Sequence, residues 1–151
     1  MTHFIQLITA FVGTVGFALF WNLNKKTIFV AGVGGILSWG MYLAMFNIAN
    51  SGIFLSAFVS AMTAGVYAET LARILKTPNT VILVPSLVPL FPGSNLYYAV
   101  SAAAVGNPEE FRVQSLATVY FTLGIACGAG IISALVMTFG EIRKRKIKKE
   151  G

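Results

Sequence analysis

The segment Thr77–Tyr98, TPNTVILVPSLVPLFPGSNLYY, decides how this chain folds. It is too apolar for a surface loop, yet too rich in proline for an uninterrupted helix. Pro85 and Pro89 each remove a backbone donor, and Pro92-Gly93-Ser94 predicts a complete break. Within hydrocarbon, a broken backbone is tolerated only where protein buries it or where it lines a wet cavity. Discontinuous spans of this kind hold substrates in many transporters, so the segment predicts a transport site.

The composition of the chain is that of an integral membrane protein. Of its 151 residues, 56% are hydrophobic and only 11% are charged, and the mean hydropathy is +0.78. Soluble domains carry about 25% charged residues, and no polar stretch here is long enough for a separate soluble domain. The single cysteine, Cys127, and the single histidine, His3, exclude a disulfide framework and a zinc site within one chain. We therefore expect neither a metal nor a cofactor.

The apolar windows predict an all-α fold, a polytopic membrane helix bundle of about five transmembrane spans. A span needs about 20 largely apolar residues, and the fourth is discontinuous at Pro92-Gly93. No soluble linker separates the spans, so residues 1–141 are expected to form one transmembrane bundle, followed by a basic cytoplasmic tail at 142–151. The predicted spans are 4–21, 28–46, 52–75, 80–105 and 114–139.

Small residues recur at a spacing of four in the second, third and fifth of these spans. They are Ala31 and Gly35 in the second span, Ala57, Ala61 and Gly65 in the third, and Gly124 and Gly128 in the fifth. In membranes, small residues at this spacing allow two helix backbones to approach closely. We expect these positions to serve helix packing.

Basic residues are distributed unevenly between the two sets of span ends. One set carries Lys25, Lys26, Arg73 and Lys76 together with the six basic residues of the tail, and the other carries Arg112 alone. The positive-inside rule then predicts an N-terminus outside the cell and a cytoplasmic C-terminus. The tail is expected to bind anionic lipid headgroups, not nucleic acid. A re-entrant hairpin in the fourth window is the alternative, and it would leave four crossings.

A candidate substrate site follows the break. The chain is expected to restart as a half-helix capped by Ser94 or Asn95. This start would leave the backbone amides of Leu96, Tyr97 and Tyr98 unpaired at the positive end of the helix dipole. A substrate carboxylate is a natural partner for such an end. The alternative is that these side chains only cap a kinked helix. The candidate substrate-binding residues are Pro92, Gly93, Ser94, Asn95, Tyr97 and Tyr98.

Glu69 and Arg73 are the only charged residues of the third span and stand one helical turn apart. Their order is the favourable one for an ion pair along a helix, and pairing offsets the cost of charge within a membrane. Glu69 falls in the last third of the span, which favours a structural pair at the interface over a proton-coupling site. No nucleophile–base pair, metal-ligand cluster or phosphate loop is present, so the sequence does not predict an enzyme.

The pattern Glu69, Ala72-Arg73, Thr77-Pro78, Pro89-Leu90 and Pro92-Gly93 resembles the threonine/serine exporter (ThrE) family, specifically its short, YjjB-like small subunit. The likeness covers nearly the whole chain in length, span number and the proline core. The family usually has valine where this chain has Phe91, a mild departure that leaves the break intact.

The resemblance implies an inner-membrane exporter of small amino acids such as threonine and serine, with some members linked to succinate. It also implies a longer companion subunit, because split members of the family pair two five-span units. We therefore predict the small subunit of a two-component exporter of small carboxylates. The alternatives are a non-transporting assembly or regulatory subunit and a homo-oligomeric channel.

Overall fold

The computed structural model describes the backbone of residues 2–150 and the side chains of residues 3–138. Every element in this part of the chain is helical, which confirms the all-α prediction. Four helices are long and apolar enough to cross a membrane, and a bent pair of helices makes a fifth crossing if it counts as one span. In chain order the elements are α1 (Thr2–Phe20), α2 (Lys25–Leu43), η1 (Ala44–Ile48), α3 (Ile53–Leu75), α4 (Asn79–Leu87), η2 (Val88–Leu90), α5 (Gly93–Ala104) and α6 (Pro108–Glu150).

The predicted break in the fourth span is present. α4 contains Pro85 and passes into the single 3-10 turn η2, after which Phe91 is extended, with φ −63° and ψ 128°. The residue before a proline is pushed towards this extended region, so Pro92 sets the conformation of Phe91 and ends the turn. Leu90, just before the break, is fully buried and fixes its position in the bundle.

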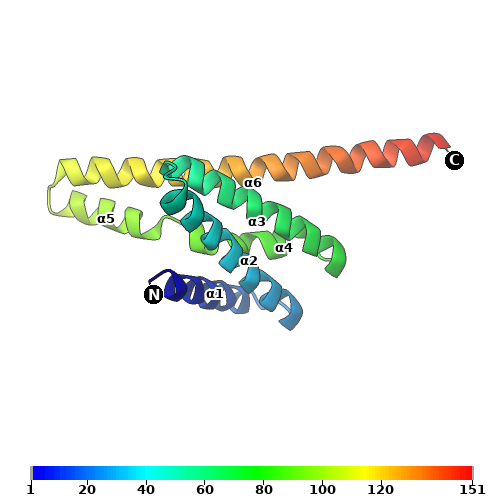
Figure 1. Cartoon of the computed structure of the whole chain (residues 1–151), viewed down its shortest axis with the longest axis horizontal. Helices are drawn as coiled ribbons and strands as arrows, with labels where there is room; N and C mark the ends of the chain where they lie inside the picture. The colour runs from blue at the N-terminus through cyan, green and yellow to red at the C-terminus, as the bar shows by residue number, and fades with distance from the viewer. Residues whose placement is uncertain (1, 151) are drawn as a thin grey trace.

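The connections between helices alternate between the two ends of the molecule (Figure 1). The α1–α2 and α3–α4 connections lie at one end, and the α2–α3 and α5–α6 connections lie towards the other. The bend between Asn79–Leu90 and α5 is 50°, so α5 continues the direction of travel of α4. A re-entrant hairpin would return the chain to its starting end, whereas α5 leads away from the end where α4 begins (Figure 1).

The small residues of α3 and α6 form a close seam, as their spacing predicts. A Cβ added to Gly124 would lie 2.6 Å from the carbonyl oxygen of Phe54, and one added to Gly128 would overlap the carbonyl oxygen of Phe58. A Cβ at Gly65 would come within 3.1 Å of the Ile132 side chain. Only glycine allows the two backbones to approach this closely.

Buried hydroxyl groups join α4 to α2. Ser38 Oγ donates to the carbonyl oxygen of Ser86 at 2.7 Å, and Ser86 Oγ donates to Ile82 O at the same distance. Pro89, three residues after Ser86, has no N–H to offer that carbonyl, so Ser38 supplies a donor where the helix is ending. Gly34 makes room for this contact, because a Cβ there would overlap Ser86 Oγ.

The last helix is longer than the sequence predicts. α6 begins at Pro108, where Asn107 Oδ1 accepts from the backbone amide of Glu110 at 3.2 Å. Asn before Pro, followed by two glutamates, starts the helix ahead of the predicted span at 114–139. At the other end the helix continues without a break through 142–150, so the backbone marks no boundary between span and tail. The side chains of the predicted basic tail lie outside the described residues.

α5 and the start of α6 form a hairpin that extends past the other helices (Figure 1). The rings of Phe121 and Tyr42 are 4.9 Å apart near the end of α2, and Gly124 faces the first turn of α3. Pro108 precedes Phe121 by thirteen positions, about 20 Å of helix. We call α5 with residues 108–120 the overhanging hairpin. Its exposed large apolar side chains are Leu96, Tyr97, Tyr98, Val100, Val105, Phe111, Val113, Leu116, Val119 and Tyr120.

Candidate functional site

The N-terminus of α5 differs in detail from the predicted site. α5 begins at Gly93 with Pro92 as its N-cap, and neither Ser94 nor Asn95 makes a side-chain cap. The expectation that one of them caps the helix is therefore wrong, because the extended Phe91 already turns the chain at Pro92. Both residues lie instead in the first turn of the helix, where their side chains approach each other at 3.5 Å.

The unpaired backbone amides at this end are also shifted by two positions. Leu96 N donates to Pro92 O at 3.0 Å, so this amide is paired, contrary to our expectation. The amides of Ser94 and Asn95 donate to no group among the described residues. The two free donors therefore belong to Ser94 and Asn95 themselves, and they lie at the positive end of the helix dipole.

This end of α5 is open on the surface of the chain. Gly93 and Ser94 are exposed, and a Cβ added to Gly93 would meet no atom within 4 Å. Tyr97 and Tyr98 are 70% and 52% exposed, with their rings 5.5 Å apart. Among the other helices of the described chain, α5 packs extensively on α6 alone. The free amides are thus available to a solute, but no other part of the chain encloses them.

An open cavity of about 230 Å³ lies beside η2, just before the break in the chain. Its lining residues come from α1, α2 and η2, and they are Gln6, Thr9, Ala10, Trp39 and Pro89. The sequence did not predict this cavity, because the α1 segment has the composition of an ordinary apolar span. The available signal was Gln6, one of two glutamines in the chain and a polar residue within an apolar window.

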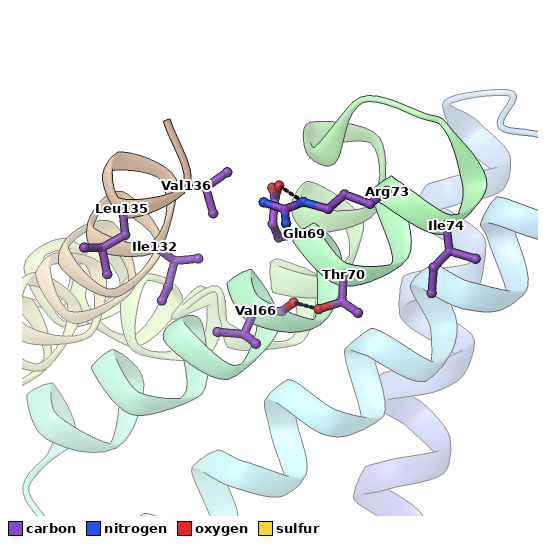
Figure 2. A pocket seen from close by; sticks show the side chains of 8 residues that line it. All are labelled: Val66, Glu69, Thr70, Arg73, Ile74, Ile132, Leu135 and Val136. Carbon is purple, nitrogen blue, oxygen red and sulfur yellow. Dashed lines mark hydrogen bonds and ion pairs between the residues drawn. The ribbon is translucent and has the colours of Figure 1, made fainter. Parts of the chain in front are cut away.

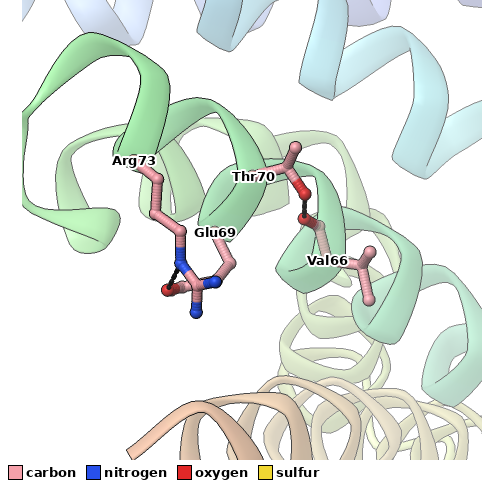
Figure 3. A network of polar contacts seen from close by, with 4 residues as sticks. All are labelled: Val66, Glu69, Thr70 and Arg73. Carbon is pink, nitrogen blue, oxygen red and sulfur yellow. Dashed lines mark hydrogen bonds and ion pairs between the residues drawn. The ribbon is translucent and has the colours of Figure 1, made fainter. Parts of the chain in front are cut away.

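Glu69 and Arg73 form the predicted ion pair, with Arg73 Nε 3.0 Å from Glu69 Oε1. Figure 2 shows both side chains pointing into a groove of about 570 Å³ between α3 and α6. The Glu69 side chain is 17% exposed and that of Arg73 is 66% exposed. On the same turn of α3, Thr70 Oγ1 donates back to Val66 O at 2.8 Å (Figure 3). Apart from the Thr70 hydroxyl, the other lining side chains are apolar, so the pair is the only charged feature among the described residues of the groove.

The structure does not bring the two predicted groups of residues together. Glu69 and Arg73 lie near the end of α3 where α4 begins, whereas α5 extends towards the opposite end (Figure 1). No described cavity is lined by residues of both groups. Within the described residues, no cluster of three or more His, Cys, Asp or Glu side chains is placed to hold a metal ion.

Comparison with known proteins gives a family for the chain. Searches of curated proteins and of solved structures found no match. The family model described as "Threonine/Serine exporter, ThrE" matches residues 6–135, a range that contains the broken span, the ion pair and the cavity beside the break. Together with the four to five candidate spans, this match identifies a multi-pass membrane protein. The chain belongs to the threonine/serine exporter family.

Proposed function

We propose that this chain is the small subunit of a two-component exporter in the cytoplasmic (inner) membrane. Its substrates are small carboxylate-bearing metabolites, threonine and serine first and succinate-type dicarboxylates second. The observation that carries the proposal is the pair of free amides at Ser94 and Asn95, at the start of a half-helix within a broken span. Membership in an exporter family supports the direction of transport.

The chemistry of the α5 N-terminus favours a carboxylate. Two N–H groups of adjacent residues present partial positive charge that is strengthened by the aligned peptide dipoles of the helix. Such ends bind carboxylates and phosphates without a basic side chain. The described residues supply no arginine or lysine near the break, so the backbone itself is the recognition element.

The overhanging hairpin supports the need for a partner. α3 has 23 residues, about 35 Å of helix, which is enough to cross a hydrocarbon core of about 30 Å by itself. The hairpin carries exposed apolar side chains past the end of α3, where no other helix of the described chain covers them. Helices of a longer companion subunit, packed beside the hairpin, would cover these side chains and enclose the N-terminus of α5. A second copy of the chain is the alternative cover.

Orientation follows from the charges. With five crossings, the positive-inside rule puts the N-terminus outside and the basic C-terminal residues in the cytoplasm, where they can bind anionic lipid headgroups. The Glu69–Arg73 pair then lies at the cytoplasmic end of α3. We assign this pair a structural role, and Glu69→Gln should leave the rate of export unchanged.

The test compares metabolites in the medium of cells with and without this chain, with the companion subunit present in both. Threonine and serine should accumulate only when the chain is present, and Gly93→Leu should abolish that accumulation while the protein stays in the membrane. Gly93 has free space around it, so the leucine obstructs the amides and not the fold. Gly52→Leu is the matched control, because Gly52 also lies at a helix start with no neighbour within 4 Å.

The rival functions give different results in the same experiment. Normal export by Gly93→Leu would exclude the site and favour a non-transporting assembly subunit, whereas Ser94→Ala and Asn95→Ala keep the backbone amides and test only the two side chains. Flux through the purified chain alone in liposomes would favour a homo-oligomeric channel. Accumulation of succinate without threonine would keep the site and change the substrate.

A further inference from the structure

The geometry of the cavity beside the break points to a second subsite, one that binds the ammonium group of an α-amino acid. This inference rests on the proposed function and selects between its two substrate classes. The cavity has a volume of about 230 Å³, whereas a water molecule occupies about 30 Å³ of liquid. It therefore has room for part or all of a small amino acid.

Gln6 supplies the main acceptor. Its Oε1 atom is buried and has no hydrogen-bond partner among the described residues, and Gln6 lines the cavity. A buried carbonyl oxygen without a donor is costly in free energy, so nearly all such atoms in folded proteins are paired. This oxygen needs a donor that the described part of the chain does not provide.

Thr9 supplies a second acceptor one turn away. Its hydroxyl group is placed to donate to the backbone oxygens of Ile5 and Gln6, at 3.1 and 2.9 Å. The hydroxyl proton is thereby engaged within α1, while the oxygen keeps lone pairs to accept a hydrogen bond from a ligand. Both polar side chains of the cavity can therefore receive hydrogen bonds from the same solute.

The remaining walls carry no charged group. Pro89 has no N–H, Ala10 is apolar, and no lining residue is basic. Trp39 contributes an indole ring, which stacks on Tyr42 with ring centroids 5.2 Å apart. Aromatic faces attract ammonium groups. An ammonium, which has three donors and no acceptor, matches the unpaired Gln6 oxygen, the Thr9 oxygen and the aromatic ring.

The cavity lies beside the carboxylate site along the chain. Pro89 forms part of its wall, and α5 begins four residues later at Gly93. Through Pro89 the wall of the cavity is joined to the start of α5 by a short stretch of chain. An α-amino acid carries both groups that this arrangement recognises, whereas a dicarboxylate carries only one of them.

The experiment measures export of threonine and of its 2-hydroxy analogue, which lacks the ammonium group. Cells make the variant chain together with its companion subunit. Gln6→Leu should lower the ratio of threonine to analogue export by about tenfold, which corresponds to about 1.4 kcal/mol, and it should leave export of the analogue unchanged. Gln6→Glu keeps an acceptor at this position and should preserve or raise the ratio. Gln114→Leu, at the only other glutamine, is the control and should leave the ratio unchanged.

Each other outcome overturns the inference. An unchanged ratio in Gln6→Leu, with normal export by the unaltered chain, means that the cavity holds only solvent. An equal loss of both substrates means that Gln6 serves the packing of α1. Export of neither compound by the unaltered chain defeats the proposed function itself, and the subsite with it.

Discussion

Small residues of α3 and α6 lie against one another in the seam, whereas large apolar side chains lie uncovered in the overhanging hairpin. Both regions share α6, and they meet near Phe121, which is buried against Tyr42. On one side of this point glycine allows backbone contact between helices. On the other side Leu116, Val119 and Tyr120 are about half exposed.

The seam is stabilised by contacts within the chain, whereas the overhanging hairpin depends on contacts with its surroundings. In the seam, the backbones of α3 and α6 gain dispersion energy from close contact, because both helices belong to this chain. The exposed apolar side chains of the overhanging hairpin lack such a neighbour in the chain. They gain dispersion energy only from lipid or from another protein. Substitutions in the seam should therefore affect folding, and substitutions in the hairpin should affect assembly and export.

Gly128→Leu should have the largest effect on stability. Its side chain would collide with the Phe58 backbone, which cannot move as a flexible side chain does. We expect a loss of about 3 kcal/mol or more, measured by unfolding of the purified protein in detergent. Gly130→Leu on the same helix is the control, because a Cβ there meets no atom within 4 Å. Equal stability of the two variants would contradict the seam.

Gly34→Ala should have the next largest effect. The added methyl group would overlap Ser86 Oγ and lie 3.0 Å from the Tyr67 ring, so α4 would have to move away from α2. The expected loss is about 1–3 kcal/mol, by the same unfolding measurement. Gly13→Ala in α1, where a Cβ has free space, should be neutral or slightly stabilising because alanine favours helix. A destabilised Gly13→Ala would show that any change of glycine is harmful.

Arg73→Ala tests whether the ion pair contributes to stability. Pairs of this spacing stabilise a helix by about 0.3–0.5 kcal/mol, and the exposure of Arg73 reduces that further. The free energy of unfolding should therefore change only slightly. Arg112→Ala removes the more exposed pair with Glu109 and should have a still smaller effect. A loss above about 1.5 kcal/mol at Arg73 would indicate a buried role that the pair's exposure does not explain.

Tyr97→Ser in the overhanging hairpin should have the smallest effect on stability. Its side chain is 70% exposed, so unfolding of the isolated chain should change by less than about 0.5 kcal/mol. Export should nevertheless fall, because the partner would lose an apolar contact there. Met137→Ser, at a side chain 72% exposed elsewhere on α6, should spare export. If Tyr97→Ser unfolds the isolated chain, the hairpin is part of the bundle's own core.

Much of the fold was predictable because hydropathy and proline act locally. The apolar windows predicted the helices α1 to α4. Pro92 predicted the break, because a proline constrains the residue before it in any context. The same local view misplaced the helix starts. The last helix begins at Pro108, ahead of the predicted span at 114–139, and the N-cap expected at Ser94 or Asn95 is Pro92. At a helix start, several nearby residues can act as the N-cap, and the backbone conformation decides which of them does.

The candidate site was predictable only in part. Residues 92–98 and the Glu69–Arg73 pair were evident, because proline, glycine and charge stand out in an apolar chain. Gln6, Thr9 and Trp39 come from other helices, and only packing of α1 and α2 against η2 brings them beside the break.

The sequence by itself determined the class of the protein, its spans, the interruption at Pro92-Gly93 and the small-residue positions of the α3–α6 seam. These properties follow from composition and from restrictions within a few residues. The tertiary structure decided where the free amides lie, how the cavity at Gln6 forms and how far the hairpin extends past α3. These features depend on the crossing points of helices distant in sequence, and such points are set by side-chain volumes meeting in space.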